Sequence, residues 1–260
     1  MQRRQLIAWG AAALASGRAP AVWGQITDPT NAINKAGRQR ALSQRLTKSY
    51  LMLGLGIEAT DAQRYLSDSV AVFDRYLVEL KAYAPSAEVR ETYDTIDATW
   101  QRFKALAVGS APSRDNAAKL LALDAQLLQA VQLGTLQFQQ ASGRPSAALV
   151  NTAGRQRMLS QRIAKFQFSR AWDVGAREAS AEITKSRDEF MAAMTTLATQ
   201  ARTAAQKQAL EAAQNQWVFF VAALDASTGA ANAGALSRLA RASELILAAF
   251  DEVTLAFERG

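Results

Sequence analysis

The chain has no cysteine and no histidine among its 260 residues. Without cysteine it cannot form disulfides, use a thiolate nucleophile or carry a lipid on a cysteine after a signal peptide. Without histidine it lacks the commonest metal ligand and the commonest general base, and a Glu-x-x-His di-iron site cannot be built. Its acids show no pairing on a shared apolar face. We therefore expect no catalytic residues, no metal site and no cofactor.

Long hydrophobic runs are also missing, since no segment reaches 18 uninterrupted apolar residues. The mature protein is therefore not expected to span a membrane. The start of the chain is distinctive: Met1–Arg4 is basic and holds an arginine pair, Leu6–Ser16 is apolar, and Val22–Gly24 offers small residues for cleavage. These features predict a signal peptide over residues 1–24 and a periplasmic protein; the arginine pair is compatible with twin-arginine export, and the sequence leaves the export route open.

Charge of one sign is only mildly in excess. The formal net charge is +7, and it falls to +4 when the three arginines of the predicted signal peptide leave. For an exported protein this excess does not indicate nucleic acid as a partner, but it slightly favours small anions.

The most informative feature that is present is a sequence motif that occurs twice, called the repeated phrase. Residues 33–48 read INKAGRQRALSQRLTK and residues 150–165 read VNTAGRQRMLSQRIAK, with eleven of sixteen positions identical. The identical residues are largely polar, whereas packing alone tolerates exchange of polar residues at surfaces and of apolar residues in cores. The repeated phrase is therefore where function should be sought.

The repeat extends beyond the phrase. At the same offset of 117 residues, Phe73 matches Phe190 and Trp100 matches Trp217. Each unit has about 115 residues, which is a usual size for a domain. We therefore predict two domains, residues 29–142 and residues 146–260, with these aromatic residues in their cores.

The composition of both units favours helices. Ala, Leu, Gln, Arg, Lys and Glu dominate, and no segment shows the alternation typical of strands. Asp28-Pro29-Thr30 predicts a helix start, and Gly143 a helix end. The remaining breaks fall near residues 60, 84–86, 109–113, 175, 200–203 and 227–229. The predicted fold is all-α: two tandem antiparallel four-helix bundles after a cleavable signal peptide.

Connectivity brings the two phrases together. An up-down-up-down bundle returns its last helix to the end where its first helix began, and the connector over residues 141–146 is short. Both phrases open the first helix of their unit, so we expect them at the same end of the molecule, within a helix diameter or two.

The spacing inside the phrase separates two sets of polar residues. At 100° per residue Arg38 and Arg45 share one face, Arg40 and Gln44 share another, and leucines mark the core. Gly37 leaves space for a ligand or another backbone beside Arg40. Because arginine stays charged and offers a planar fork of donors, one arginine from each unit would suit a planar oxyanion held between them.

The phrase resembles the PilJ-type sensor domain, the periplasmic four-helix module of type IV pili methyl-accepting chemotaxis transducers. It is also similar to the input domain of nitrate/nitrite sensor kinases, in which an Asn, an Ala-Gly pair and an Arg three residues after the Gly recur. In those kinases nitrate is held between two such helices across a dimer axis. Between the Gly and the Arg this chain carries Arg38-Gln39 and Arg155-Gln156, as PilJ-type domains do, where the kinases have small or apolar residues.

The resemblance implies a ligand site. Its clamping arginines correspond to Arg40 and Arg157, beside glycines that allow close approach. The other implied residues are a second arginine pair and the asparagines of the motif. The full set is Asn34, Gly37, Arg40, Arg45, Asn151, Gly154, Arg157 and Arg162.

The leading hypothesis is an exported sensor that binds a small oxyanion such as nitrate or nitrite and reports to a membrane receptor or sensor kinase. Two fused units would then replace a receptor dimer, since the chain shows no membrane helix or cytoplasmic signalling part of its own. The alternative is a ligand-free module that docks on a chemoreceptor or sensor kinase. The arginines could also be solvated helix-face charges, with Asn34 and Asn151 only capping helices, and a carboxylate enzyme would need acids clustered in a pocket.

Overall fold

The computed structural model describes residue 26, residues 28–228 and residues 232–260. The predicted signal peptide, residues 1–24, lies outside the described residues. In the described part of the chain all regular structure is helical, in eight helices. These are α1 (Pro29–Leu55), α2 (Ala59–Tyr83), α3 (Ala87–Gly109), α4 (Arg114–Ser142), α5 (Ala147–Ala171), α6 (Ala176–Gln200), α7 (Ala204–Ala226) and α8 (Ala233–Arg259). The all-α prediction is confirmed.

Local sequence sets the ends of these helices. The side chain of Asp28 accepts a hydrogen bond from the Thr30 amide at the start of α1, where Pro29 occupies the first turn. Thr203 and Gln206 form a capping box at the start of α7. Gly143 ends α4 with a left-handed backbone, φ 59°, a conformation that favours glycine. The helix ends predicted from these breakers are confirmed.

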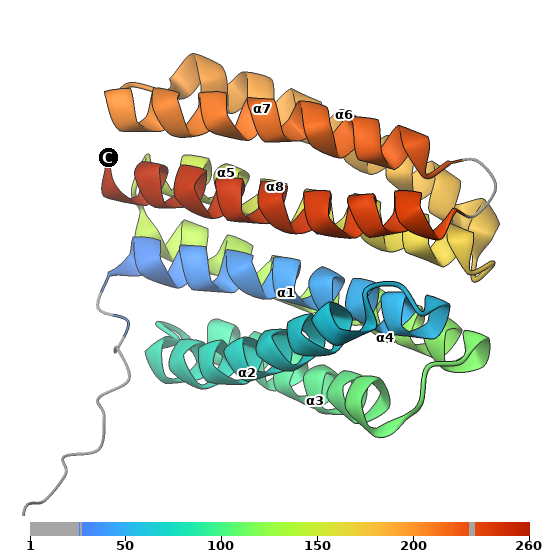
Figure 1. The fold of residues 1–260 in the computed structure, drawn as a ribbon. Coiled ribbons are helices and arrows are strands. Elements are labelled where there is room, and N and C mark those ends of the chain that lie inside the picture. The colour runs from blue at the N-terminus through green and yellow to red at the C-terminus, as the bar shows by residue number, and fades with distance from the viewer. Residues whose placement is uncertain (1–25, 27, 229–231) are drawn as a thin grey trace, which may run out of the picture.

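The two first helices, α1 and α5, lie side by side at the centre of the molecule and make its most extensive helix–helix contact. Figure 1 shows α2 and α3 on one side of the molecule, α6 and α7 on the opposite side, and α1, α4, α5 and α8 between them. Each half repeats one arrangement, because its first helix contacts both its second and its fourth. The two four-helix bundles therefore join through their first helices.

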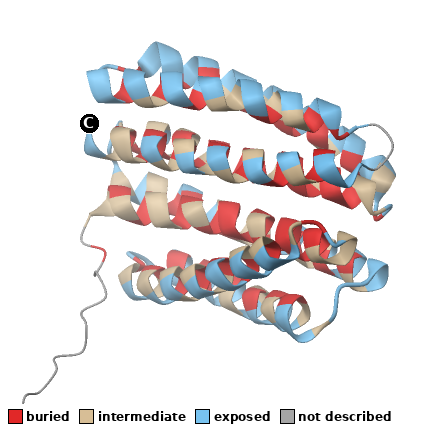
Figure 2. Cartoon of the chain, viewed as in Figure 1, coloured by how far each residue is buried: buried red, intermediate tan, exposed pale blue. Residues whose placement is uncertain are grey.

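This central position buries most of α1 and α5. Their buried positions include much of the repeated phrase, whereas α2 is buried along a single stripe (Figure 2). The apolar core is continuous through both halves. Trp100 is fully buried and stacks on Phe73 at 3.9 Å between ring centroids. Its counterpart Trp217 stacks equally on Phe190 but is only half-buried.

Candidate functional site

The repeated phrases lie in α1 and α5, which run in the same direction from the same end of the molecule (Figure 1). The predicted proximity of the two phrases is confirmed, and it is closer than expected. Hydrogen bonds between the phrases join the two helices directly. Because α1 is surrounded by α2, α4 and α5, the face that carries Arg40 and Gln44 is buried as fully as the leucine face.

Arg40 and Arg157 form a reciprocal pair across this helix contact. Nη2 of Arg40 donates to Oδ1 of Asn151 at 2.8 Å, and Nη2 of Arg157 donates to Oδ1 of Asn34 at 2.8 Å. Each Nη2 also reaches the carbonyl oxygen of the same asparagine. The side chains of Arg40 and Arg157 are essentially inaccessible to solvent. Four residues of the predicted site are thus in direct contact.

Gly37 and Gly154 form the wall beside this pair. A Cβ atom at Gly37 would lie 3.0 Å from Nη2 of Arg40 and 3.7 Å from Nη2 of Arg157, and a Cβ atom at Gly154 would have the mirrored distances of 3.7 Å and 3.1 Å. The two guanidinium groups therefore share the space that the absent side chains leave. A side chain at either position would press on the guanidinium of its own helix.

The outer nitrogens of the two arginines have different partners. Nη1 of Arg40 donates to Oε1 of Gln132 on α4 at 2.6 Å, whereas Nη1 of Arg157 donates to Oδ1 of Asp251 on α8 at 2.9 Å. Asp251 also pairs with Arg38 at 3.0 Å. In the described residues no carboxylate pairs with Arg40, and neither arginine's Nε has an acceptor.

Burial sets the charge balance of the pair. Burial, followed by repulsion from Arg155 and Arg157, lowers the pKa of Arg40 from 12.5 to about 9. Burial also lowers the pKa of Arg157, although Asp251 opposes that shift. Both groups remain cationic at neutral pH, because an arginine side chain is not deprotonated in proteins and even a pKa of about 9 keeps Arg40 protonated there. The centre of the molecule therefore holds two adjacent buried cations.

A second reciprocal layer lies further along the same helices. Nζ of Lys48 donates to Oε1 of Gln161, and Nζ of Lys165 donates to Oε1 of Gln44, at 2.8 and 2.7 Å. Each lysine also pairs with an acid of the opposite unit, as described next. Burial lowers the pKa of Lys48 and of Lys165 against the opposing effect of those acids.

The acids of this second layer come from the fourth helix of each unit. Lys48 pairs with Glu244 on α8 at 2.6 Å, and Lys165 pairs with Asp124 on α4 at 2.6 Å. Each lysine therefore connects its own first helix to the other unit. The contact between the two bundles therefore includes a buried, reciprocal set of ion pairs and hydrogen bonds beside its apolar residues.

A family model described as "Type IV pili methyl-accepting chemotaxis transducer N-term" (PilJ) matches residues 25–126 and 138–244. The chain belongs to the PilJ family. The two matched ranges correspond to the two repeats, and the family is a sensory one rather than a catalytic one. No curated protein and no solved structure matches the chain.

The structure separates the second arginine pair of the PilJ phrase from the first. Arg45 donates to Glu244 at 2.6 Å and to Ser69 of α2, and Arg162 pairs with Glu182 of α6. Both therefore face the second helix of their own repeat. Arg45 reaches the site indirectly, because its partner Glu244 also binds Lys48.

Sequence reasoning missed the half of the site that the fourth helices supply. Gln132 and Gln139 on α4 and Asp251 and Glu258 on α8 all hydrogen bond to residues of the repeated phrases. These positions lie outside the repeated phrase, and the two PilJ repeats differ there. A comparison of the repeats at an offset of 119 residues, which aligns α4 with α8, would have paired Gln132 with Asp251 and Gln139 with Glu258.

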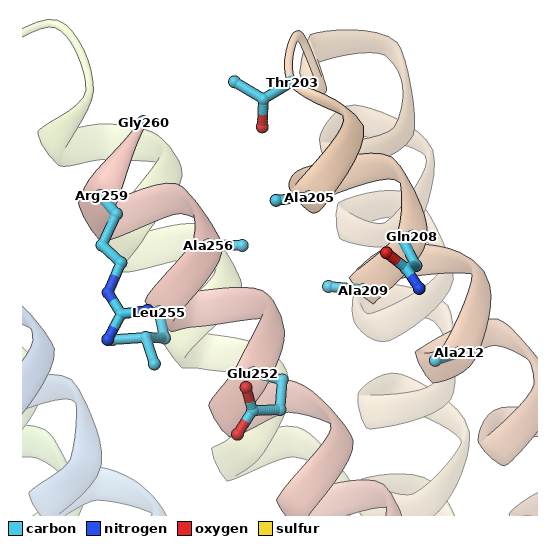
Figure 3. A pocket seen from close by; sticks show the side chains of 10 residues that line it. All are labelled: Thr203, Ala205, Gln208, Ala209, Ala212, Glu252, Leu255, Ala256, Arg259 and Gly260. Atoms are coloured by element: carbon cyan, nitrogen blue, oxygen red, sulfur yellow. The ribbon is translucent and has the colours of Figure 1, made fainter.

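Two grooves of the surface lie away from the arginine pair. A groove of about 590 Å³ between α7 and α8 is lined mainly by small side chains, with Glu252 and Arg259 at its edge (Figure 3). A corresponding groove of about 710 Å³ lies between α3 and α4. Neither groove contains a residue of the repeated phrases. A smaller hollow of about 200 Å³ between α1 and α8 is lined by Arg38, Arg45 and the two acids that pair with them.

Two kinds of site have no support in the described residues. No group of three or more metal-ligating side chains is gathered in residues 28–228 and 232–260. None of the helices there combines the length and the apolar character that a membrane span needs.

Proposed function

We propose that the chain is an exported, periplasmic sensor that binds a small oxyanion of the nitrate or nitrite class between α1 and α5 and reports its presence to a membrane receptor or sensor kinase. Its units are two PilJ-type four-helix domains, residues 29–142 and 146–260. Arg40 and Arg157 clamp the anion, and Gly37 and Gly154 let their guanidinium groups lie close together. Arg45 supports the site through Glu244, which also binds Lys48, and Arg162 holds α5 against α6 through Glu182.

One observation carries this proposal: two buried guanidinium groups meet beside two glycines and are satisfied on that side by neutral acceptors only. Oδ1 of Asn34 and Oδ1 of Asn151 accept from them at 2.8 Å. A charged oxygen makes a stronger hydrogen bond to a guanidinium than an amide oxygen does. A planar oxyanion that replaced these amide oxygens would therefore gain on both arginines at once.

Binding at this position would be coupled to helix packing. Asn34 and Asn151 each belong to the helix opposite the arginine that they bind. An anion that took their place would exchange two interhelical hydrogen bonds for contacts through itself. The distance and register of α1 against α5 would then differ between the free and the bound state, which is the kind of two-state element a receptor partner could read.

The experiment is thermal melting of residues 25–260 with nitrate, nitrite, chloride, sulfate and acetate at matched ionic strength. A ligand that binds the native state raises its stability by mass action. We expect selective stabilisation by one anion, lost in both Arg40→Ala and Arg157→Ala. The matched control is Arg114→Ala, because Arg114 is exposed and lies outside the site. Equal, small responses to all five anions would overturn the proposal.

A second candidate function is a ligand-free interaction module. It is favoured by the fact that the Nη atoms of Arg40 and Arg157 already have acceptors within the protein. It is also favoured by two consecutive apolar residues on α7, Val218 and Phe219, which are about two-thirds exposed. An exposed apolar surface suits a protein partner better than an anion. This candidate predicts a stable complex with a receptor and no anion-selective change in melting temperature.

A further inference from the structure

The two sides of the arginine pair differ in charge although they match in geometry. Gln132 on α4 and Asp251 on α8 take equivalent places, because each accepts from Nη1 of the arginine in its own unit. Gln139 and Glu258 are equivalent about two helical turns further along α4 and α8. Gln139 accepts from Asn151, which binds Arg40, and Glu258 accepts from Asn34, which binds Arg157. At both positions the α4 residue is a neutral amide and the α8 residue is a carboxylate.

This difference is concentrated around one arginine. Arg157 has Asp251 as its ion-pair partner, and its asparagine, Asn34, is held by Glu258. Arg40 has Gln132, and its asparagine, Asn151, is held by Gln139. All the side chains that contact Arg40 through hydrogen bonds are therefore amides. The four residues compared on α4 and α8 are all at least half-buried.

The neighbouring arginines follow the same pattern. Asp251, the partner of Arg157, also pairs with Arg38, at a nitrogen–oxygen distance of 3.0 Å. Arg155, the counterpart of Arg38, is paired with Glu189 of α6 instead, and its charge acts on Arg40 as repulsion. Arg40 is thus the buried cation whose hydrogen-bond partners are all neutral, and it is also repelled by the charge of Arg155. Burial of a charge is costly unless an opposite charge accompanies it.

We infer that the anion site is one-sided: the single anion between the two arginines lies toward Arg40, Asp251 fills the equivalent place at Arg157 as a built-in carboxylate, and Gln132 is the residue that leaves the Arg40 side open to a ligand. This inference rests on the proposed function and names the specificity-determining residue of that site. The low pKa of Arg40 agrees with it, because an anion would restore the charge balance that burial disturbs.

The chemistry of the amide group explains why glutamine suits this role. In the free protein Oε1 of Gln132 accepts from Arg40. A carboxamide also carries two N–H donors, so rotation of the group would let it donate to an anion bound at Arg40. A carboxylate is an acceptor only and would repel the anion. Asp251 therefore closes its side of the pair, and Gln132 does not.

The test is calorimetric titration of residues 25–260 with sodium nitrate at constant ionic strength. For the wild-type protein we expect one nitrate per chain. Gln132→Glu should place a carboxylate opposite Arg40 and weaken nitrate binding by about tenfold or more. Asp251→Asn should uncover Arg157, and we expect tighter binding or a second nitrate per chain. Circular dichroism would verify that each variant folds, and Asp251→Asn decides alone if Gln132→Glu does not fold.

The outcomes separate the two proposals. If wild-type protein binds no nitrate and shows no anion-selective melting, the proposed function and this inference both fail. If wild-type protein binds nitrate, but Gln132→Glu leaves binding unchanged or Asp251→Asn abolishes it, the sensor function stands and the one-sided site is wrong. The double variant Gln132→Glu with Asp251→Asn is expected to regain nitrate binding, now on the Arg157 side of the pair, and failure to regain binding counts against the inference.

Discussion

At the residue scale the glycines of the phrase decide what can stand next to the arginines. Gly37 is buried inside α1, where glycine weakens a helix by about 1 kcal/mol relative to alanine. Its retention in a well-formed helix therefore points to the space beside it. That space is where the guanidinium groups of Arg40 and Arg157 approach one another.

Gly37→Ala should separate folding from binding. The new methyl would lie 3.0 Å from Nη2 of Arg40, close enough to displace this flexible group. The gain in helix propensity of about 1 kcal/mol offsets much of that strain, so we expect a melting temperature near that of wild type and no response to anions. The control is Gly109→Ala, since Gly109 has open space around it. A retained anion response in Gly37→Ala would contradict the placement of the site.

Glu244 makes the stability of the fold depend on pH. Burial acts to raise the pKa of Glu244, but Lys48 and Arg45 outweigh it and lower the pKa from 4.5 to about 2. A carboxyl group with a lower pKa in the folded than in the unfolded state stabilises the fold above the unfolded value. That stabilisation is lost as pH falls toward the folded value.

The expected loss can be measured against a reference without the pair. Between about pH 6 and about pH 3 the wild-type free energy of unfolding should fall by about 2 kcal/mol more than that of a Lys48→Met, Glu244→Gln double variant. Urea unfolding at the two pH values measures both. Removal of both partners avoids leaving Lys48 buried without a counter-ion. Parallel losses in the two proteins would show that Glu244 is not perturbed as described.

At the element scale, sequence reasoning performed best where a single residue type determines local conformation. Asp28, Pro29 and Gly143 mark helix ends through capping, fixed φ and a left-handed turn, and the structure places ends there. The antiparallel order of the helices could be predicted because the loops between them are short. The acids of α4 and α8 were not foreseen, because a buried carboxylate looks like any surface acid until its partner is known. Glu244 pairs with a lysine 196 positions away.

The contact of α1 with the end of α5 offers a test at this scale. A methyl at Gly54 of α1 would overlap the ring of Trp172, which follows α5. We expect Gly54→Ala to destabilise the fold by about 1–3 kcal/mol through overpacking, despite its gain in helix propensity. Urea unfolding gives the change. Trp172→Leu in the same background should relieve part of it, and strictly additive effects of the two substitutions would argue against the contact.

At the scale of the whole molecule, the two bundles are held by more than their connector. Lys48 and Lys165 each link their own first helix to two helices of the other unit, and both links are buried. Separation of the bundles would also expose to water the apolar residues of the core that runs through both halves, and this opposes separation. The connector over residues 143–146 is mostly exposed and is not needed to hold this contact.

Cleavage of the connector should therefore leave the molecule intact. With a protease site inserted between Gly143 and Ser146, we expect the two fragments to co-elute in size-exclusion chromatography at micromolar concentration after complete cleavage. Uncleaved protein provides the reference elution volume. Two separate, smaller species would show that the contact between α1 and α5 depends on the covalent link.

The covalent link has another consequence, for how the site can change over generations. In an assembly of two identical chains every substitution at a shared axis is made twice, so both sides must accept it together. Here the axis runs between two segments of one polypeptide, and selection acts on each segment alone. Gln139 and Glu258, which accept from corresponding asparagines, differ in charge. A chain that holds both halves of such a contact can therefore carry different residues at equivalent positions on the two sides.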